Sequence, residues 1–335
     1  MQIGSGEHTY AWIDRWARIP DTETARLGWA HHAVVATADG KIIAFHPGDP
    51  TTLVFDRDGN LQSAWNADLA EAHGMTVVQD GGTEYLWIAD QGAKRALQDG
   101  YTYQMASKGW QVVKTTLDGK IVARLSEPPP LALYAEKRYA PTWVAVNEER
   151  HGGNGDVWVT DGYGQSYVHR YNNAGAYVGS INGEEGRAGA FACPHAIWVD
   201  PRKAEPELYV ADRTNHRIQV YDLDGRFKRV FGSDFLSSPS AFARIGDRLV
   251  IGELRARLTI LDENDQLVCY LGENEAVCGV DGWPNVKDEQ GAISRTDRLE
   301  PGRFNSPHGL AADGDGNLYV SEWLIGGRFT KLAKI

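Results

Sequence analysis

Long apolar runs and an excess of positive charge are both missing from this chain of 335 residues. No stretch approaches the roughly 20 consecutive apolar residues that a membrane-spanning helix needs. Acidic residues outnumber basic ones by 45 to 34, which gives a net charge of −11. Phosphate backbones and anionic membrane surfaces attract basic proteins. We therefore expect neither a nucleic acid nor a membrane as a partner.

Cysteine is scarce as well. The chain has only Cys193, Cys269 and Cys278, none of them in a Cys-x-x-Cys pair, and three thiols cannot all pair with one another. Its first residues lack the basic segment and apolar run of a secretory signal. We therefore expect reduced thiols and a cytoplasmic protein. Because Cys193 lies two residues before His195, a thiolate metal ligand is an alternative role for it.

Convincing amphipathic helices are few, and the best candidate is the short segment Leu69-Ala70-Glu71-Ala72. By contrast, 11 tryptophans, 14 tyrosines and 37 glycines are typical of a β-rich protein with many tight turns.

A four-strand unit repeats along the chain. Its clearest copy has apolar segments at Pro194–Asp200, Glu207–Asp212, Arg217–Tyr221 and Phe227–Phe231, with an Asp224-Gly225 turn before the last. This pattern predicts an antiparallel meander, which is the unit of a propeller blade.

Six copies of the unit are recognisable. They start near His32, His73, Pro141, Pro194, Pro239 and His308. The last copy ends with its third strand at residues 329–332, whereas residues 10–16 form an extra strand before the first copy. We therefore predict an all-β, six-bladed β-propeller with four-stranded antiparallel blades, whose last blade is closed by the N-terminal strand.

We expect a single domain spanning residues 1–335, because no shift in composition marks a boundary. Insertions at residues 92–110 and 272–304 interrupt the repeat. Loops of this length in a compact domain are usually functional, and one of them is a candidate cover for a ligand pocket.

Histidine recurs at one register of the repeat, close to the start of the first strand. The four copies are His32, His73, His195 and His308, while the other two blades carry Thr142 and Ser240. Matching positions of a ring of repeats meet at its axis, and neutral imidazoles gathered there predict a divalent metal site. Zinc is the first expectation, with iron and manganese as alternatives.

Two points at this register stay open. His31 neighbours His32, and either could be the inward-facing histidine. The histidines could also serve only to cap strands by hydrogen bonding.

Acidic residues end the second strands of five blades: Asp90, Asp161, Asp212, Glu253 and Glu322. They could orient the histidines or tie down the turns between strands, and we favour the turns.

Candidates for chemistry follow the second strands. Tyr163 could move a proton beside a metal ion, with His46 in reserve, and Arg213 could bind a carboxylate or a developing oxyanion.

Two segments resemble the NHL repeat: Tyr209-Val210-Ala211-Asp212-Arg213-Thr214-Asn215-His216-Arg217-Ile218-Gln219-Val220-Tyr221 and Phe304-Asn305-Ser306-Pro307-His308-Gly309-Leu310. Within that class, most of the chain resembles the catalytic core of peptidyl-α-hydroxyglycine α-amidating lyase. The resemblance implies a six-bladed propeller with zinc on three axial histidines.

On this resemblance, the metal ligands are His73, His195 and His308. Tyr163 in Val159-Thr160-Asp161-Gly162-Tyr163 matches the catalytic tyrosine of the lyase, and Arg213 matches an arginine that faces the substrate. The chain departs from the lyase where Pro47 replaces a catalytic arginine and Gly309 replaces an acidic calcium ligand, and His32 is an additional histidine.

Together these features predict a metal-dependent lyase, with a hydrolase as second choice, acting on a small polar metabolite such as a hydroxylated acid, amide or sugar derivative. Two alternatives stay open. One is a non-catalytic NHL-type propeller that binds a protein partner, and the other is a four-histidine non-haem iron enzyme. The sequence does not predict an oligomeric state.

Overall fold

The computed structural model describes all residues except 32, 108, 130–133 and 135–137. It divides into two compact units. The first comprises residues 1–71, 93–106 and 242–335, and the second comprises residues 72–92 and 107–241. The prediction of one domain over residues 1–335 stays a prediction, and each unit is described by itself.

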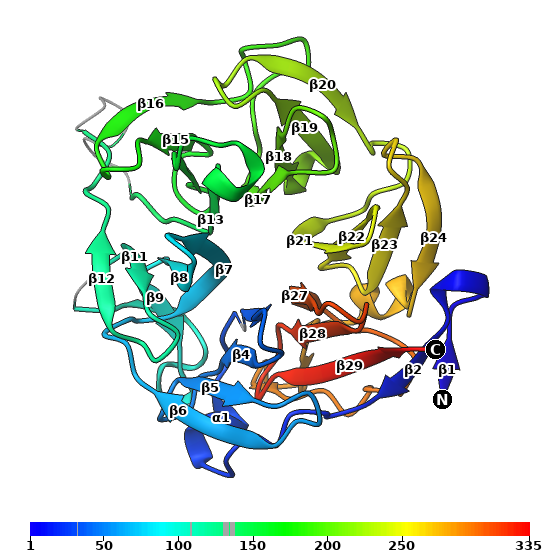
Figure 1. The fold of residues 1–335 in the computed structure, drawn as a ribbon. Helices are drawn as coiled ribbons and strands as arrows, with labels where there is room; N and C mark the ends of the chain where they lie inside the picture. The colour runs from blue at the N-terminus through cyan, green and yellow to red at the C-terminus, as the bar shows by residue number, and fades with distance from the viewer. Residues whose placement is uncertain (32, 108, 130–133, 135–137) are drawn as a thin grey trace. The chain divides into compact units, whose positions relative to one another are not determined.

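The second unit contains three four-stranded antiparallel sheets, each built from strands in chain order (Figure 1). They are β7 (Ala72–Asp80), β8 (Thr83–Asp90), β11 (Gln111–Thr115) and β12 (Ile121–Arg124); β13 (Trp143–Val146), β14 (Val157–Thr160), β15 (Val168–Tyr171) and β16 (Tyr177–Ile181); and β17 (Pro194–Asp200), β18 (Glu207–Asp212), β19 (Arg217–Tyr221) and β20 (Phe227–Phe231). Two short 3-10 helices, η4 (Glu149–His151) and η5 (Arg213–Asn215), lie between strands.

The first unit contains the other blades. They are β3 (Val34–Ala36), β4 (Ile42–Phe45), β5 (Thr52–Phe55) and β6 (Leu61–Trp65); β21 (Pro239–Ile245), β22 (Arg248–Glu253), β23 (Arg257–Leu261) and β24 (Leu267–Leu271); and β27 (Pro307–Ala312), β28 (Leu318–Glu322), β29 (Arg328–Lys334), β2 (Tyr10–Ile13) and β1 (Gln2–Ile3). The boundary between the units falls within β21. The predicted all-β, six-bladed propeller is confirmed.

The N-terminal strand completes the last blade, as predicted. Strand β2 pairs antiparallel with β29, with Trp12 opposite Leu332, so the hydrogen-bonding edge of β29 is covered. Trp12 is 5% exposed, packs against Phe304 at 4.7 Å between ring centroids, and lies beneath the guanidinium of Arg328. The two ends of the chain are therefore joined through one sheet.

Asp-Gly turns close the outer hairpins of three blades, at residues 58–59, 118–119 and 224–225. In the β19–β20 turn, Gly225 has a φ of +84°, and its N–H donates to the carbonyl of Asp222. Left-handed backbone of this kind favours glycine because glycine has no Cβ. A register shift between Val220 and Tyr221 shows that the turn feeds a β-bulge.

Both insertions carry short elements of the first unit. Residues 92–110 include β9 (Ala93–Arg95), η2 (Leu97–Asp99) and β10 (Tyr103–Met105), and residues 272–304 include η6 (Glu275–Gly279), β25 (Val286–Lys287) and β26 (Ile293–Ser294). Near the N-terminus the unit adds η1 (Gly6–His8).

The short helix candidate at residues 69–72 is not helical, and β7 already begins at Ala72. The α-helix of the described chain is instead α1 (Glu23–Leu27), capped by the Thr22 hydroxyl, which accepts the N–H of Ala25. Among the described residues, no helix is long and apolar enough to cross a membrane.

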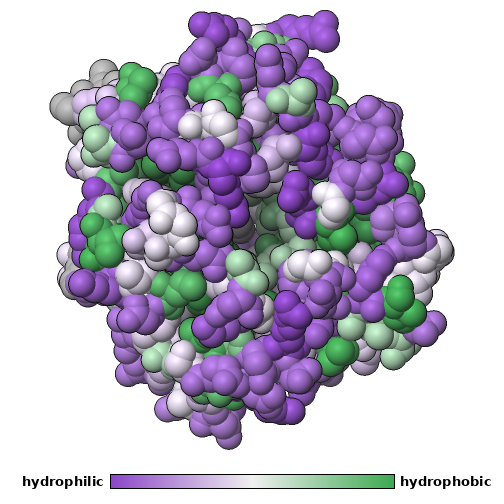
Figure 2. Space-filling view, in the orientation of Figure 1, coloured by the Kyte–Doolittle hydropathy of each residue, from purple (hydrophilic) through white to green (hydrophobic). Residues whose placement is uncertain are grey.

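Apolar side chains fill the space between neighbouring sheets of each unit. Second strands such as β14 and β18 are buried along their whole length, because sheets pack on both of their faces. Outer strands are more exposed, and they carry the apolar residues that face solvent, including Leu61, Val122 and Val178. Polar residues cover most of the surface in view, with small apolar patches among them (Figure 2).

Trp12→Ala tests the importance of the closing strand. The substitution should lower the free energy of unfolding by about 3–5 kcal/mol, because it removes a buried indole from the contacts with Phe304 and Arg328. Urea denaturation followed by circular dichroism measures the loss. Ile13→Ala is the matched control on the same strand, since Ile13 is 40% exposed, and it should cost less than about 1 kcal/mol. Equal losses in the two variants would contradict a special role for the buried edge contact.

Candidate metal centre

Each described histidine of the predicted register, namely His73, His195 and His308, is the second residue of its strand and is buried. The strand pairing shifts register at each of them, between Ala72 and Gly74, between Pro194 and Ile197, and between Pro307 and Gly309. A bulge of this kind takes a residue out of the ladder and changes where its side chain points. The repeated histidine of the sequence therefore coincides with a repeated bulge in the first strand of these three blades.

In the second unit, the rings of His73 and His195 lie 4.8 Å apart between centroids. Nδ1 of His73 lies 2.7 Å from the carbonyl oxygen of Thr142, and Nδ1 of His195 lies 2.8 Å from that of Ser240. Because a carbonyl oxygen can only accept, Nδ1 carries the proton in both neutral rings. Nε2 then holds the lone pair, which is the form in which imidazole binds a metal ion.

Thr142 connects the two histidine strands. Its carbonyl accepts from His73, and its Oγ1 lies 3.2 Å from the carbonyl oxygen of Pro194, the residue before His195. Gly74 permits this approach, since a Cβ there would lie 2.4 Å from the Thr142 oxygen. Thr142, from the blade between them, therefore helps to hold the strands of His73 and His195 in place.

Tyr163 lies against both imidazoles, with ring centroids 4.9 Å from His73 and 5.6 Å from His195. Its hydroxyl is 3.2 Å from Nε2 of His195 and donates to that nitrogen. Arg213, from η5, donates through Nη1 to the same hydroxyl at 3.2 Å. The structure thus brings together four of the predicted residues, His73, His195, Tyr163 and Arg213.

In the first unit, His31 is the described histidine that accompanies His308, at 4.8 Å between ring centroids. The backbone N–H of His31 donates to Oε1 of Glu71 at 2.8 Å, and its Nδ1 also bonds Glu71. Both residues are almost fully buried. A carboxylate behind an imidazole is a common outer partner of metal-binding histidines.

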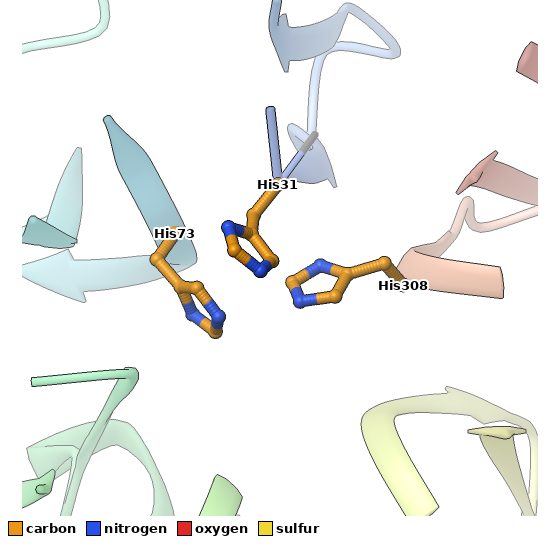
Figure 3. Close-up of side chains that lie close together, drawn as sticks. All are labelled: His31, His73 and His308. Atoms are coloured by element: carbon orange, nitrogen blue, oxygen red, sulfur yellow. The ribbon is translucent and has the colours of Figure 1, made fainter. Parts of the chain in front are cut away.

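Of the two adjacent histidines at this place, the structure describes His31, which lies beside His308. His32 lies outside the described residues. The imidazoles of His31 and His308, both of the first unit, lie next to each other (Figure 3).

Residues of the first insertion surround His31. The Tyr103 hydroxyl lies 3.3 Å from Nε2 of His31, and Trp323 stacks on the imidazole at 5.4 Å. The guanidinium of Arg95 lies 4.4 Å from the ring centroid of Trp29 and 4.1 Å from that of Tyr103. Sequence reasoning missed this aromatic cluster, because its residues come from three distant segments with no shared motif.

A cavity of about 250 Å³ lies beside this cluster within the first unit. Leu27 and Phe45 are part of its apolar wall, and its charged lining consists of Glu23, Glu71, Lys94 and Arg95. Residues 94–98 of the first insertion thus line a pocket, as expected for one of the two long insertions.

Three of the five acidic residues at the ends of the second strands tie down loops, in agreement with the interpretation favoured above. Asp161 accepts the N–H of Ala140, Asp212 accepts that of Ala192, and Glu322 accepts that of Ser306. In each case the bonded loop lies just before the first strand of the same blade. The carboxylates therefore fix the loops from which the first strands begin.

Two other candidates face their own loops. His46 is buried at the end of β4, and its Nε2 lies 2.6 Å from the carbonyl oxygen of Pro50. Its role as a reserve base stays a prediction. The Cys193 thiol has its pKa raised by burial, an effect that the nearby Arg213 opposes, which makes a thiolate ligand less favourable.

A buried polar network lies behind the tyrosine turn of the second unit. Tyr134 donates its hydroxyl to Asp161 at 2.6 Å and accepts from Nε2 of His169 at 2.9 Å. Nδ1 of His169 lies 2.6 Å from Oγ of Ser180, which also bonds Tyr177. Burial lowers the pKa of His169 to about 3 and raises that of Asp161 to about 6.

Comparisons with known proteins agree with this fold. The chain is 28% identical to mouse NHL repeat-containing protein 3 over 261 residues, which is 70% of this chain and 68% of that protein. It is 29% identical to rat peptidylglycine alpha-amidating monooxygenase over 285 residues, which is 82% of this chain and 25% of that protein. The predicted resemblance to NHL-repeat propellers is confirmed. No family model matches the chain.

Solved structures show the same fold at lower identity. A streptogramin B lyase superposes with a TM-score of 0.57 and 13% identity, covering 98% of this chain and 99% of the other. Virginiamycin B lyase from Staphylococcus aureus gives a TM-score of 0.55 at 13% identity, over 97% of this chain and 100% of the other.

The buried network predicts how stability depends on pH. The pKa of His169 is lowered on folding, so the unfolded chain takes up the extra proton and stability falls as pH drops below about 6.5. Asp161 acts in the opposite direction between about pH 6 and 4, because its pKa is raised on folding. His169→Gln should remove about 2 kcal/mol of the stability difference between pH 7.5 and pH 5.

Urea denaturation at the two pH values measures this difference. Asp161→Asn should steepen the loss at low pH, and His151→Gln, at an exposed position of η4, should match the wild type. An unchanged pH dependence in His169→Gln would show that His169 does not titrate as its burial implies.

Proposed function

We propose that this protein is a metal-dependent lyase, with hydrolysis as second choice, that acts on a small polar metabolite. The ion would be divalent, with zinc as first choice. On the sequence register, its ligands would be His73, His195 and His308, with His31 or His32 as a fourth. The main support for this proposal is that Nδ1 of His73 and Nδ1 of His195 each donate to a backbone carbonyl. Nε2 of each ring is therefore the nitrogen with the lone pair.

The first unit supports the same donor set. Nδ1 of His31 bonds the Glu71 carboxylate, so this ring also has its Nδ1 engaged. Imidazoles held from behind in this way keep their orientation without an ion, which lowers the cost of binding one. The donor set of buried neutral imidazoles suits zinc, iron or manganese better than calcium or magnesium.

When bound, the ion would polarise a substrate oxygen or lower the pKa of a bound water. Tyr163 would move a proton at its hydroxyl oxygen, because that atom lies beside the His195 nitrogen and is held by Arg213. Arg213 would bind a substrate carboxylate or a developing oxyanion through its remaining N–H groups. The substrate class is a hydroxylated acid, amide or sugar derivative, and the similarity to peptidylglycine alpha-amidating monooxygenase favours the amide.

The three cysteines, Cys193, Cys269 and Cys278, are all free thiols, which supports a reducing compartment, the cytoplasm.

A non-catalytic propeller that binds a protein partner is the second candidate. The similarity to NHL repeat-containing protein 3 over 70% of the chain supports it. The two candidates differ in whether a metal ion is required, so metal analysis comes first.

Elemental mass spectrometry of the purified protein should find about one zinc, iron or manganese ion per chain. His195→Ala and His308→Ala should each lose that ion, because they remove ligands on different strands. His151→Ala, on the exposed η4, should retain it. Circular dichroism confirms that each variant is folded. A metal-free wild type, or an ion retained in both ligand variants, would contradict the proposal and favour the binding module.

Tyr163→Phe tests the proton transfer. On any substrate found by screening hydroxylated acids, amides and sugar derivatives, turnover should fall by about 10²–10⁴-fold, because the variant keeps the ring but removes the hydroxyl. Metal content should not change. Tyr85→Phe, on β8 of the same unit, should leave turnover as in the wild type. Full activity in Tyr163→Phe would exclude Tyr163 as the proton-transfer group.

A further inference from the structure

Five arginines line a second cavity, which lies within the first unit and has a volume of about 630 Å³. They are Arg15, Arg18, Arg26, Arg295 and Arg328. Asp21, which pairs with Arg26, is the acidic residue of the lining. This concentration of positive charge contrasts with the net charge of −11 of the whole chain. We call this site the arginine pocket.

Arg295 is the central feature of the pocket. It comes from the second insertion, and its guanidinium donates Nη1 to the carbonyl of Ile325 and Nη2 to that of Gly327, the latter at 2.9 Å. Both partners are neutral, and in the described part of the chain Arg295 forms no ion pair. Burial and the positive charges of Arg15 and Arg328 lower its pKa below the usual range. A half-buried cation is therefore held near other cations without a carboxylate of its own.

The backbone is shaped to hold Arg295. A Cβ at Gly326, which has a φ of +69°, would lie 2.6 Å from Nη1 of Arg295, so only glycine fits there without displacement. The N–H of Gly326 donates to the carbonyl of Gly28 at 2.7 Å, which joins the β28–β29 turn to the end of α1. These contacts keep the guanidinium in place before any ligand arrives.

The remaining arginines differ in how far their charge is already neutralised. Arg328 is committed to Asp14, Glu322 and the carbonyls of Glu300 and Arg303. By contrast, Arg18 is exposed, and in the described residues its side chain forms no ion pair. Arg15 is 73% exposed, and its contact with Asp14 is 4.0 Å long.

We propose that the arginine pocket binds a small organic anion with more than one negative oxygen, a phosphate ester or a polycarboxylate. Guanidinium groups match carboxylate and phosphate oxygens in pairs, and several of them favour a multiply charged ligand. Ile19, Pro20 and Phe329 give the pocket an apolar wall that suits a short carbon framework. The volume lies within the range of small-molecule sites.

Isothermal titration calorimetry with inorganic phosphate and with succinate, each at constant ionic strength, tests this site. Arg295→Gln and Arg18→Gln should each weaken binding by about tenfold, because each removes a charged hydrogen-bond donor. Arg18→Gln guards against a folding defect, since Arg295 also holds Ile325 and Gly327. Arg244→Gln, at an exposed position of β21 outside the pocket, should bind as the wild type does. Added sodium chloride should weaken binding by screening the charges.

Binding of phosphate alone, or of succinate alone, would support the site and identify its anion class. If neither anion binds the wild type at millimolar concentration, the proposal is wrong. It is also wrong if Arg18→Gln and Arg295→Gln bind as tightly as Arg244→Gln. These measurements need no bound metal, so they are independent of the proposed lyase activity.

Discussion

A bulge at the beginning of the first strand is the constraint on which the candidate metal centre depends. In a regular strand, side chains alternate strictly between the two faces of the sheet. The register shifts at His73, His195 and His308 each interrupt that alternation by taking a residue out of the ladder. An imidazole in this position can reach a backbone carbonyl of the neighbouring blade, as the rings of His73 and His195 do.

Within the second unit, the packing of the blades therefore also sets the orientation of the histidine rings. The carbonyls of Thr142 and Ser240 orient the imidazoles, and each carbonyl belongs to the blade next to the one that carries the histidine. Gly74 is part of the same constraint, because a side chain there would meet the Thr142 oxygen. Any change in how these sheets pack would rotate an imidazole, so the packing that stabilises the fold also pre-organises the ligands.

The sequence was sufficient to predict the fold and to name several residues that the structure brings together. The repeat of paired apolar segments and Asp-Gly turns predicted the blades, and the lone strand at residues 10–16 predicted how the last blade closes. The register also identified His73 and His195, and the residues after the second strands identified Tyr163 and Arg213. The fold predictions succeeded because they rest on local periodicity, which recurs along the chain.

Other parts of the site depend on contacts that have no local pattern. The pairing of His31 with Glu71 joins residues 40 positions apart, and the carbonyls behind His73 and His195 belong to the main chain, where residue type gives no signal. The arginine pocket draws Arg15 from the N-terminal segment and Arg295 from an insertion. Such groups meet only because the fold brings them together.

The turn at Asp161 shows how one carboxylate can serve both stability and the site. Its Oδ1 accepts the N–H of Ala140, whose carbonyl in turn accepts the N–H of Tyr163 at 3.3 Å. Its Oδ2 accepts the Tyr134 hydroxyl and so connects the turn to His169. Burying this carboxylate is costly, as its raised pKa shows, and these hydrogen bonds offset the cost only while the turn keeps its shape. The position of the Tyr163 hydroxyl is therefore linked to the same buried network that makes stability depend on pH.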